Sequence, residues 1–145
     1  SFINDDPYEA FLLDELDVRE FTYTRDACLL VNDESLPAVE NEILRSHLLR
    51  SVCPITNQPD WGSLTIRYSG PAIQKEGLLR YIVSFRQHDG FHEQCVEQIY
   101  SDLMRQCQAT HLTVCAQYTR RGGIDINPIR SNHPAPLPLN RLWRQ

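Results

Sequence analysis

Residues 75–107 read KEGLLRYIVSFRQHDGFHEQCVEQIYSDLMRQC, and this stretch decides the fold. Apolar residues recur three and four positions apart on both sides of Asp89-Gly90, a spacing that is typical of amphipathic helices. We predict one helix over residues 75–87 and a second over residues 91–107, separated by a turn at Gly90. The two apolar stripes are Leu78, Leu79, Ile82, Val83 and Phe85, and then Cys95, Val96, Ile99, Leu103, Met104 and Cys107.

Alternating segments, which indicate strands, flank the helices. Residues 63–68 (SLTIRY) precede the helices and residues 112–118 (LTVCAQY) follow them, after which Gly122-Gly123 turns the chain into a further strand over residues 124–129. Residues 42–50 (EILRSHLLR) fit a helix or a strand equally well by periodicity. The order predicts an α+β domain, an antiparallel four-stranded sheet with two helices on one face.

The ends of the chain differ in composition from this middle part. Residues 1–38 are acidic and irregular, with one short strand predicted over residues 18–24, and residues 132–145 form a Pro-rich tail that we expect to be extended. The folded unit is therefore expected over residues 39–131. There is no initiator methionine, and we expect the chain to be the later part of a longer polypeptide.

Charge and composition exclude several classes of protein. The net charge of −5 argues against a direct nucleic-acid partner, which needs concentrated Lys and Arg. No apolar run approaches the roughly 18 residues that span a bilayer, and no basic leader precedes an apolar stretch. The five cysteines are odd in number and lack CxxC spacing, which favours reduced thiols. We therefore expect a cytoplasmic protein without membrane contact or a metal site.

A thiol and a carboxylate share the stretch SVCPITNQPDWGS at residues 51–63. Pro54 ends a regular element at Cys53, and Pro59 stiffens the chain before Asp60. Most cysteines are buried structural thiols, but the end of an element is where active-site groups gather. We interpret Cys53 as a candidate nucleophile. Because a carboxylate raises the pKa of a neighbouring thiol, Asp60 is better assigned as an acid that protonates what the sulfur attacks.

The stretch DGFHEQC places Phe91, His92 and Glu93 at the first turn of the second predicted helix. His92 could be a structural histidine, and Glu93 could simply favour the positive end of the helix dipole. Together, an aromatic ring, an imidazole and a carboxylate suit a flat heteroaromatic ligand. The carboxylate can accept two hydrogen bonds from an N–H edge such as that of guanine.

The stretch TRRGGIDINPIR begins at Thr119. Arg120 and Arg121 before Gly122-Gly123 can be a solvated hairpin tip. They can also be a phosphate site, because glycine lets backbone N–H groups approach and a guanidinium supplies forked donors.

Three segments, CPITNQPDW, FRQHDGFHEQC and YTRRGGIDINPIRS, together resemble the NADPH-dependent 7-cyano-7-deazaguanine reductases, the nitrile reductases of queuosine biosynthesis. The resemblance covers most of residues 44–131. It implies the tunnelling fold, and with it a strand over residues 42–50. It also implies that this chain is the C-terminal unit of the long form, in which two such units are fused, and that residues 1–38 connect it to the N-terminal half.

The resemblance also implies roles for the candidate residues. The nucleophile falls on Cys53, the proton donor on Asp60, the substrate-binding pair on His92-Glu93, and a cofactor contact on Arg121-Gly122. The implied reaction reduces a nitrile to a primary amine through a cysteine thioimide, with NADPH as cofactor and a homodimer as the assembly.

Two departures from related patterns matter. The Glu-Ser-Lys-Ser-like cofactor motif has no counterpart here and is expected in the N-terminal half. The zinc-dependent pterin cyclohydrolases share the fold but need a histidine where this chain has Thr56. Two rival hypotheses are a non-catalytic partner domain that binds a purine-like ligand and a redox-regulated unit with a Cys53–Cys95 disulfide.

Overall fold

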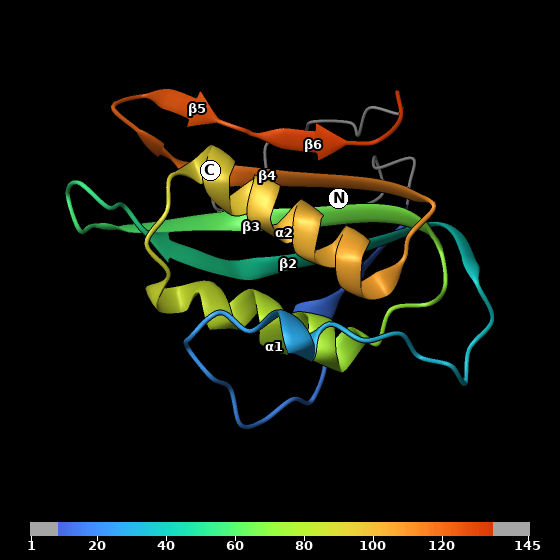
Figure 1. The fold of residues 1–145 in the computed structure, drawn as a ribbon. Coiled ribbons are helices and arrows are strands. Elements are labelled where there is room, and N and C mark those ends of the chain that lie inside the picture. Colours follow the sequence, from blue (N-terminus) through green and yellow to red (C-terminus); the bar gives the residue numbers. More distant parts are fainter. Residues whose placement is uncertain (1–8, 135–145) are drawn as a thin grey trace.

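A sheet with two helices on one face forms the centre of the molecule (Figure 1). The computed structural model describes residues 9–134. The strands are β1 (Ala10–Leu12), β2 (Val39–Val52), β3 (Pro59–Gly70), β4 (His111–Arg121), β5 (Ile124–Ile126) and β6 (Ile129–Ser131). The α-helices are α1 (Lys75–Ser84) and α2 (His92–Cys107), and the 3-10 turns are η2 (Leu13–Glu15), η3 (Ala27–Leu29) and η4 (Phe85–Gln87).

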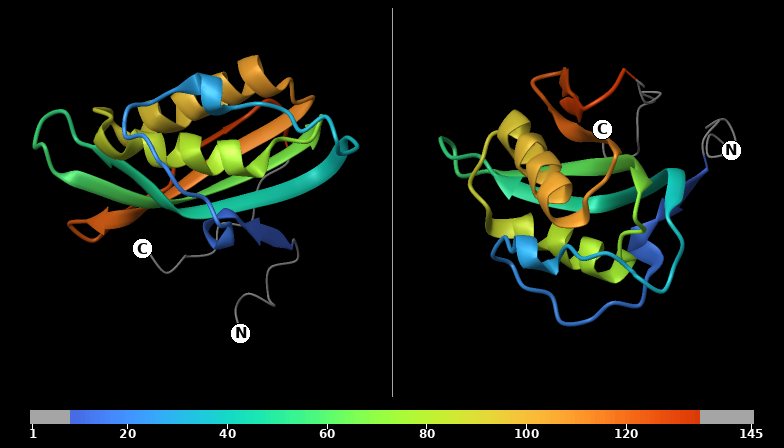
Figure 2. Two further views of the ribbon diagram at one scale, coloured as in Figure 1. Left: turned by 90° about the horizontal axis from the view of Figure 1, so that it is seen from below. Right: turned by 45° about the vertical axis from the view of Figure 1, so that its right-hand side comes forward.

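The α+β class and the placement of both helices on one face are confirmed, and Figure 2 shows the helices layered on the sheet. The strand number is corrected, because the described residues form six strands in the order β1-β2-β3-β4-β5, with β6 also paired to β4. β1 joins β2 in parallel, and the other pairings are antiparallel. The prediction of one strand over residues 124–129 is wrong. Pro128 separates β5 from β6, since proline cannot donate to a strand ladder.

β2 is a strand throughout, as the family resemblance implied. Its pairing with β3 is interrupted between Val39 and Glu42 and again between Ser46 and Leu49. Each irregularity shifts which side chains face the core. The apolar residues of this strand therefore do not alternate cleanly, which explains why its periodicity was ambiguous.

The core lies between the sheet and the helices. Leu64, Ile66 and Tyr68 of β3 are buried there, together with apolar residues of α1, α2 and β4. The prediction of a strand over residues 18–24 is wrong, because these residues run as coil and Val18 and Phe21 pack partly against the core instead. Within residues 9–134, no helix has the length and apolar character needed to cross a bilayer.

Candidate active site

The hairpin between β2 and β3 positions Cys53 and Asp60. Ser51 pairs with Asp60 in the ladder, and the Cys53 N–H donates to the Gln58 carbonyl at 3.0 Å, which extends the pairing beyond the strand. The Asn57 N–H donates to the Cys53 carbonyl at 2.9 Å and closes the loop. Because side chains alternate along a strand, Ser51, Cys53 and Asp60 share the helix-facing side of the hairpin. Both predicted reactive groups are mostly buried, with 9% of Cys53 and 7% of Asp60 exposed.

The segment before α2 runs beside the end of β2. The Val52 N–H donates to the His88 carbonyl at 2.9 Å, and the Gly90 N–H donates to the Val52 carbonyl at 3.0 Å. These two bonds place the first turn of α2 next to the Cys53 loop. Two sequence segments about forty residues apart therefore meet at one end of the sheet.

His92 contacts the predicted acid directly. Its Nε2 lies 3.3 Å from Oδ2 of Asp60, and its side chain is 13% exposed. The separation is that of an ion pair, although the angles at Nε2 do not meet those of a hydrogen bond among the described residues. The opposing carboxylate and imidazole can share or exchange a proton.

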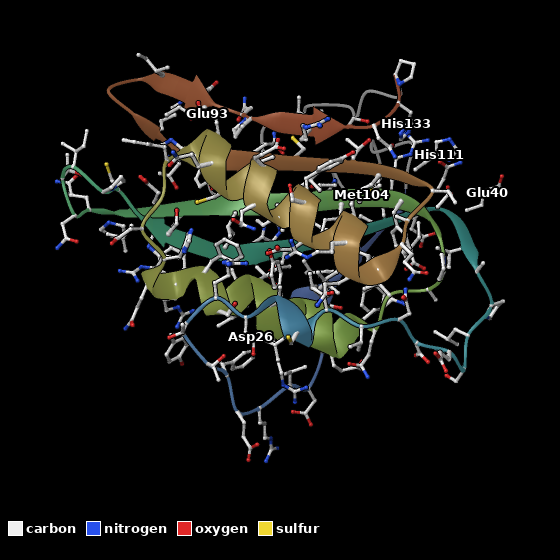
Figure 3. The ribbon with its side chains drawn as sticks, in the orientation of Figure 1. Asp26, Glu40, Glu93, Met104, His111 and His133 are labelled. Carbon is white, nitrogen blue, oxygen red and sulfur yellow. The ribbon has the colours of Figure 1, made fainter. Side chains whose placement is uncertain are left out.

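Phe91 and Glu93 lie on the open side of this contact. Phe91 is 40% exposed, and its backbone N–H donates to Oε1 of Gln94 at 3.0 Å. Glu93 is exposed at the start of α2, as Figure 3 shows. Phe91 and Glu93 are therefore accessible to a ligand, whereas His92, Cys53 and Asp60 are mostly buried.

Cys95 is completely buried one turn along α2 from His92. Burial raises the pKa of its thiol, and the hydroxyl groups of Ser51 and Tyr118 beside it oppose this shift in part. Cys53 and Cys95 both carry free thiols in this structure, so a disulfide between them stays a prediction.

Arg121-Gly122 lies at the turn between β4 and β5. Gly122 and Gly123 have positive φ angles of 58° and 80°, which glycine adopts without strain. No atom lies within 4 Å of a Cβ built at either residue. The open backbone of this turn fits one contact to a phosphate-bearing cofactor such as NADPH. Arg120 is already engaged, because its Nε donates to Oδ1 of Asp125 at 2.7 Å.

Sequence reasoning missed Ser51, Gly62 and Tyr118 as parts of the site. Tyr118 was interpreted only as an apolar residue of an alternating strand, yet its ring centroid lies 4.2 Å from that of His92. Gly62 lies within β3, where an isolated glycine often marks a close approach, but the predicted strand begins at Ser63 and leaves this glycine outside it. Among the described residues, no three His, Cys, Asp or Glu side chains are grouped to hold a metal ion.

Comparison with known sequences assigns the family. The sequence model described as "QueF-like protein" matches residues 59–136, more than half of the chain. This chain belongs to the QueF-like protein family. The matched region contains Asp60, the His92-Glu93 pair at the start of α2, and the Gly122-Gly123 turn.

Curated relatives of this QueF-like chain carry one name. It is 53% identical over 133 residues to the NADPH-dependent 7-cyano-7-deazaguanine reductase of Cupriavidus metallidurans, covering 92% of this chain and 48% of that protein. It is 56% identical over 134 residues to the reductase of the same name from Polaromonas naphthalenivorans, covering 92% and 47%. The resemblance found in the sequence is confirmed. The chain spans about half the length of these relatives.

A solved structure shares the fold of this QueF-like chain. The crystal structure of the apo archaeosine synthase QueF-Like superposes with a TM-score of 0.59 at 17% identity, over 70% of this chain and 99% of that chain. At this identity the match concerns the fold alone, and it confirms the tunnelling fold.

Proposed function

We propose that this chain carries the nucleophile and the acid of an NADPH-dependent reduction of the nitrile of 7-cyano-7-deazaguanine to the primary amine 7-aminomethyl-7-deazaguanine. The contact between Asp60 and His92 beside the Cys53 loop supports the proposal most directly. It joins the hairpin to the first turn of α2. The names and the identity of the curated relatives support the substrate and the cofactor.

The first step is addition across the nitrile. The S–H bond of Cys53 breaks as its sulfur bonds to the nitrile carbon, and Asp60 transfers a proton to the nitrile nitrogen, so the product is a covalent thioimide. During this addition His92 carries the proton released by the thiol to the Asp60 carboxylate, so the pair ends the step in its starting protonation state. A covalent intermediate divides one difficult reduction into smaller steps.

Substrate binding uses the exposed side of the site. The Glu93 carboxylate accepts hydrogen bonds from the N–H edge of the deazaguanine, and Phe91 offers a ring for stacking. The short hairpin loop holds Cys53 and Asp60 at a set separation before the ligand arrives, so little further ordering is needed.

NADPH, when bound, supplies the two hydrides that the reduction of a nitrile to an amine consumes. The open Gly122-Gly123 turn supports a contact through Arg121-Gly122. We propose that the N-terminal half of the full polypeptide contributes the rest of the cofactor site, and that the protein acts as a cytoplasmic homodimer.

The test is adduct formation by the full polypeptide that contains these residues. Incubation with 7-cyano-7-deazaguanine in the absence of NADPH should raise the intact mass by that of one substrate molecule. Cys53→Ala should abolish the adduct. The matched control is Cys28→Ala, since Cys28 is exposed and outside the site, and it should leave the adduct unchanged.

Two results would overturn the proposal. An adduct that persists in Cys53→Ala would show that another group reacts. The absence of any adduct in the unmodified protein would favour the rival hypothesis of a non-catalytic domain that binds a purine-like ligand.

A further inference from the structure

The ring of Tyr118 in β4 lies directly over Gly62 in β3. The two residues are paired in the ladder, and a Cβ built at Gly62 would lie 3.0 Å from Cδ1 and 3.3 Å from Cε1 of Tyr118. Such distances are shorter than ordinary van der Waals contacts. The missing side chain of Gly62 is therefore what allows the Tyr118 ring to occupy its place.

The same ring supports His92. The centroids of the two rings are 4.2 Å apart and their planes are tilted by 58°. Nε2 of this imidazole lies 3.3 Å from the Asp60 carboxylate. His92 is thus held between an aromatic ring from β4 and a carboxylate from β3, although it belongs to α2.

Tyr118 is a buried phenol beside the imidazole. Its side chain is fully buried, and its hydroxyl lies beside Ser51 and Cys95 without a hydrogen bond of good geometry among the described residues. Burial raises the pKa of Tyr118 well above its ordinary value. The phenol therefore stays neutral at physiological pH and cannot serve as a base.

We propose that Tyr118 is a positioning residue whose ring, seated on Gly62, holds the His92 imidazole against the Asp60 carboxylate. This inference rests on the function proposed above, because it concerns proton supply by the Asp60–His92 pair. Without the ring, the imidazole can turn away from Asp60, and proton transfer to the nitrile slows while the outer Phe91 and Glu93 contacts to the substrate remain.

Several titratable groups must be considered in any pH profile assigned to His92. Asp60 on β3 and Tyr118 on β4 contact its ring, and Cys95 on α2 lies beside Tyr118. Cys53, His88, Asp89 and Glu93 are the titratable groups of the adjoining segments. A shift of the profile is therefore assigned to His92 only if the NMR titration of its own ring shifts with it.

The experiment uses three variants of the full polypeptide. Tyr118→Leu removes the ring, Gly62→Ala displaces it, and Tyr118→Phe keeps it. We expect Tyr118→Leu and Gly62→Ala to slow adduct formation about tenfold to a hundredfold and to shift its pH profile, since a small misplacement can cost that much. Substrate affinity should change less than about twofold, and Tyr118→Phe should recover the rate to within about threefold.

The matched control is Tyr100→Leu. Tyr100 is also a buried tyrosine, but it lies on α2 about two turns after His92. There its ring faces the guanidinium of Arg130, which lies 4.4 Å from the ring centroid. Its replacement should lower stability without changing the pH profile. A profile that shifts equally in Tyr100→Leu would overturn the proposal, because general loosening would then account for the effect.

A second measurement does not depend on activity. Compared with Tyr118→Leu, the unmodified protein should show the NMR signals of the His92 ring protons displaced by the Tyr118 ring, and Gly62→Ala should reduce this displacement. The proposal would be overturned if the His92 ring-proton signals showed no such displacement. It would also be overturned if Tyr118→Phe slowed adduct formation as much as Tyr118→Leu. If no adduct forms at all, the proposed function fails, while the ring-proton shifts still decide whether Tyr118 positions His92.

Discussion

The surroundings of each cysteine decide which thiols of this chain can react. Cys28 is exposed, while Cys107 and Cys115 are buried in or beside the core. Burial raises the pKa of Cys107 and of Cys115 from 9.0 to about 11. Cys53 differs from both because it ends a strand at the loop that carries Asp60.

We predict that Cys107 and Cys115 react with iodoacetamide at pH 8 at least about a hundredfold more slowly in the native protein than in the unfolded chain, because a rise of two pKa units lowers the thiolate fraction that much. Peptide mass mapping after timed quenching gives the rates. Unfolding in urea is the control and should equalise the cysteines. Equal labelling of Cys28 and Cys107 in the native protein would contradict the burial.

The raised pKa values of Cys107 and Cys115 also make the stability of the fold fall as the pH rises. Because the folded pKa of each thiol is raised, its contribution to stability is complete below pH 9 and is lost as the pH rises toward 11. This follows since the unfolded chain releases protons that the folded chain retains.

At the scale of elements, α2 joins the site to the rest of the fold. Its N-terminal turn carries His92, and its buried Asp102 binds groups from two other segments and from α2 itself. Oδ2 of Asp102 accepts from Nη1 of Arg25 at 2.8 Å and from the Tyr81 hydroxyl at 2.6 Å, and Oδ1 accepts from Gln98 and Arg105. One carboxylate therefore ties α2 to α1 and to the segment before β2.

We predict that Asp102→Asn lowers the free energy of unfolding by about 3 kcal/mol. The substitution removes the negative charge of the buried carboxylate and one of its two acceptor oxygens, so the groups that donate to Asp102 lose part of their partner. Urea denaturation measures this. The control is Arg105→Ala, which should cost less than about 1 kcal/mol, since the Arg105 side chain is 63% exposed. Similar losses for both variants would contradict the assignment of Asp102 as the centre of the cluster.

At the scale of the molecule, the segment that precedes β2 belongs to the packed structure. β1 adds a short parallel strand to the edge of β2, and Leu13 and Leu30 are buried in the core at 0% and 2% exposure. Residues 1–38 were expected to be a connection, and the described part of them also covers apolar surface.

We predict that Leu13→Ala lowers the free energy of unfolding by about 3 kcal/mol, as expected for a fully buried leucine. Leu36→Ala is the matched control from the same segment and should change stability by less than about 0.5 kcal/mol, because Leu36 is 47% exposed. Equal stability of both variants in thermal and urea unfolding would show that the segment is only a linker.

Local chemistry and periodicity were sufficient to predict the two helices and their position between strands, and they singled out the residues to which we assign the proposed reaction. A helical stripe, or a proline after Cys53, acts over a few neighbouring residues and can be recognised in the chain itself. The resemblance in three separated segments added the fold.

Only the tertiary structure decided the rest. It placed the two irregularities in β2, added β1 at the edge, and brought Gly62, Tyr118 and His92 together from three elements. These features depend on pairing register and on contacts between residues far apart in the chain. A shift of one residue in a strand turns every side chain to the other face, so no local pattern could specify them.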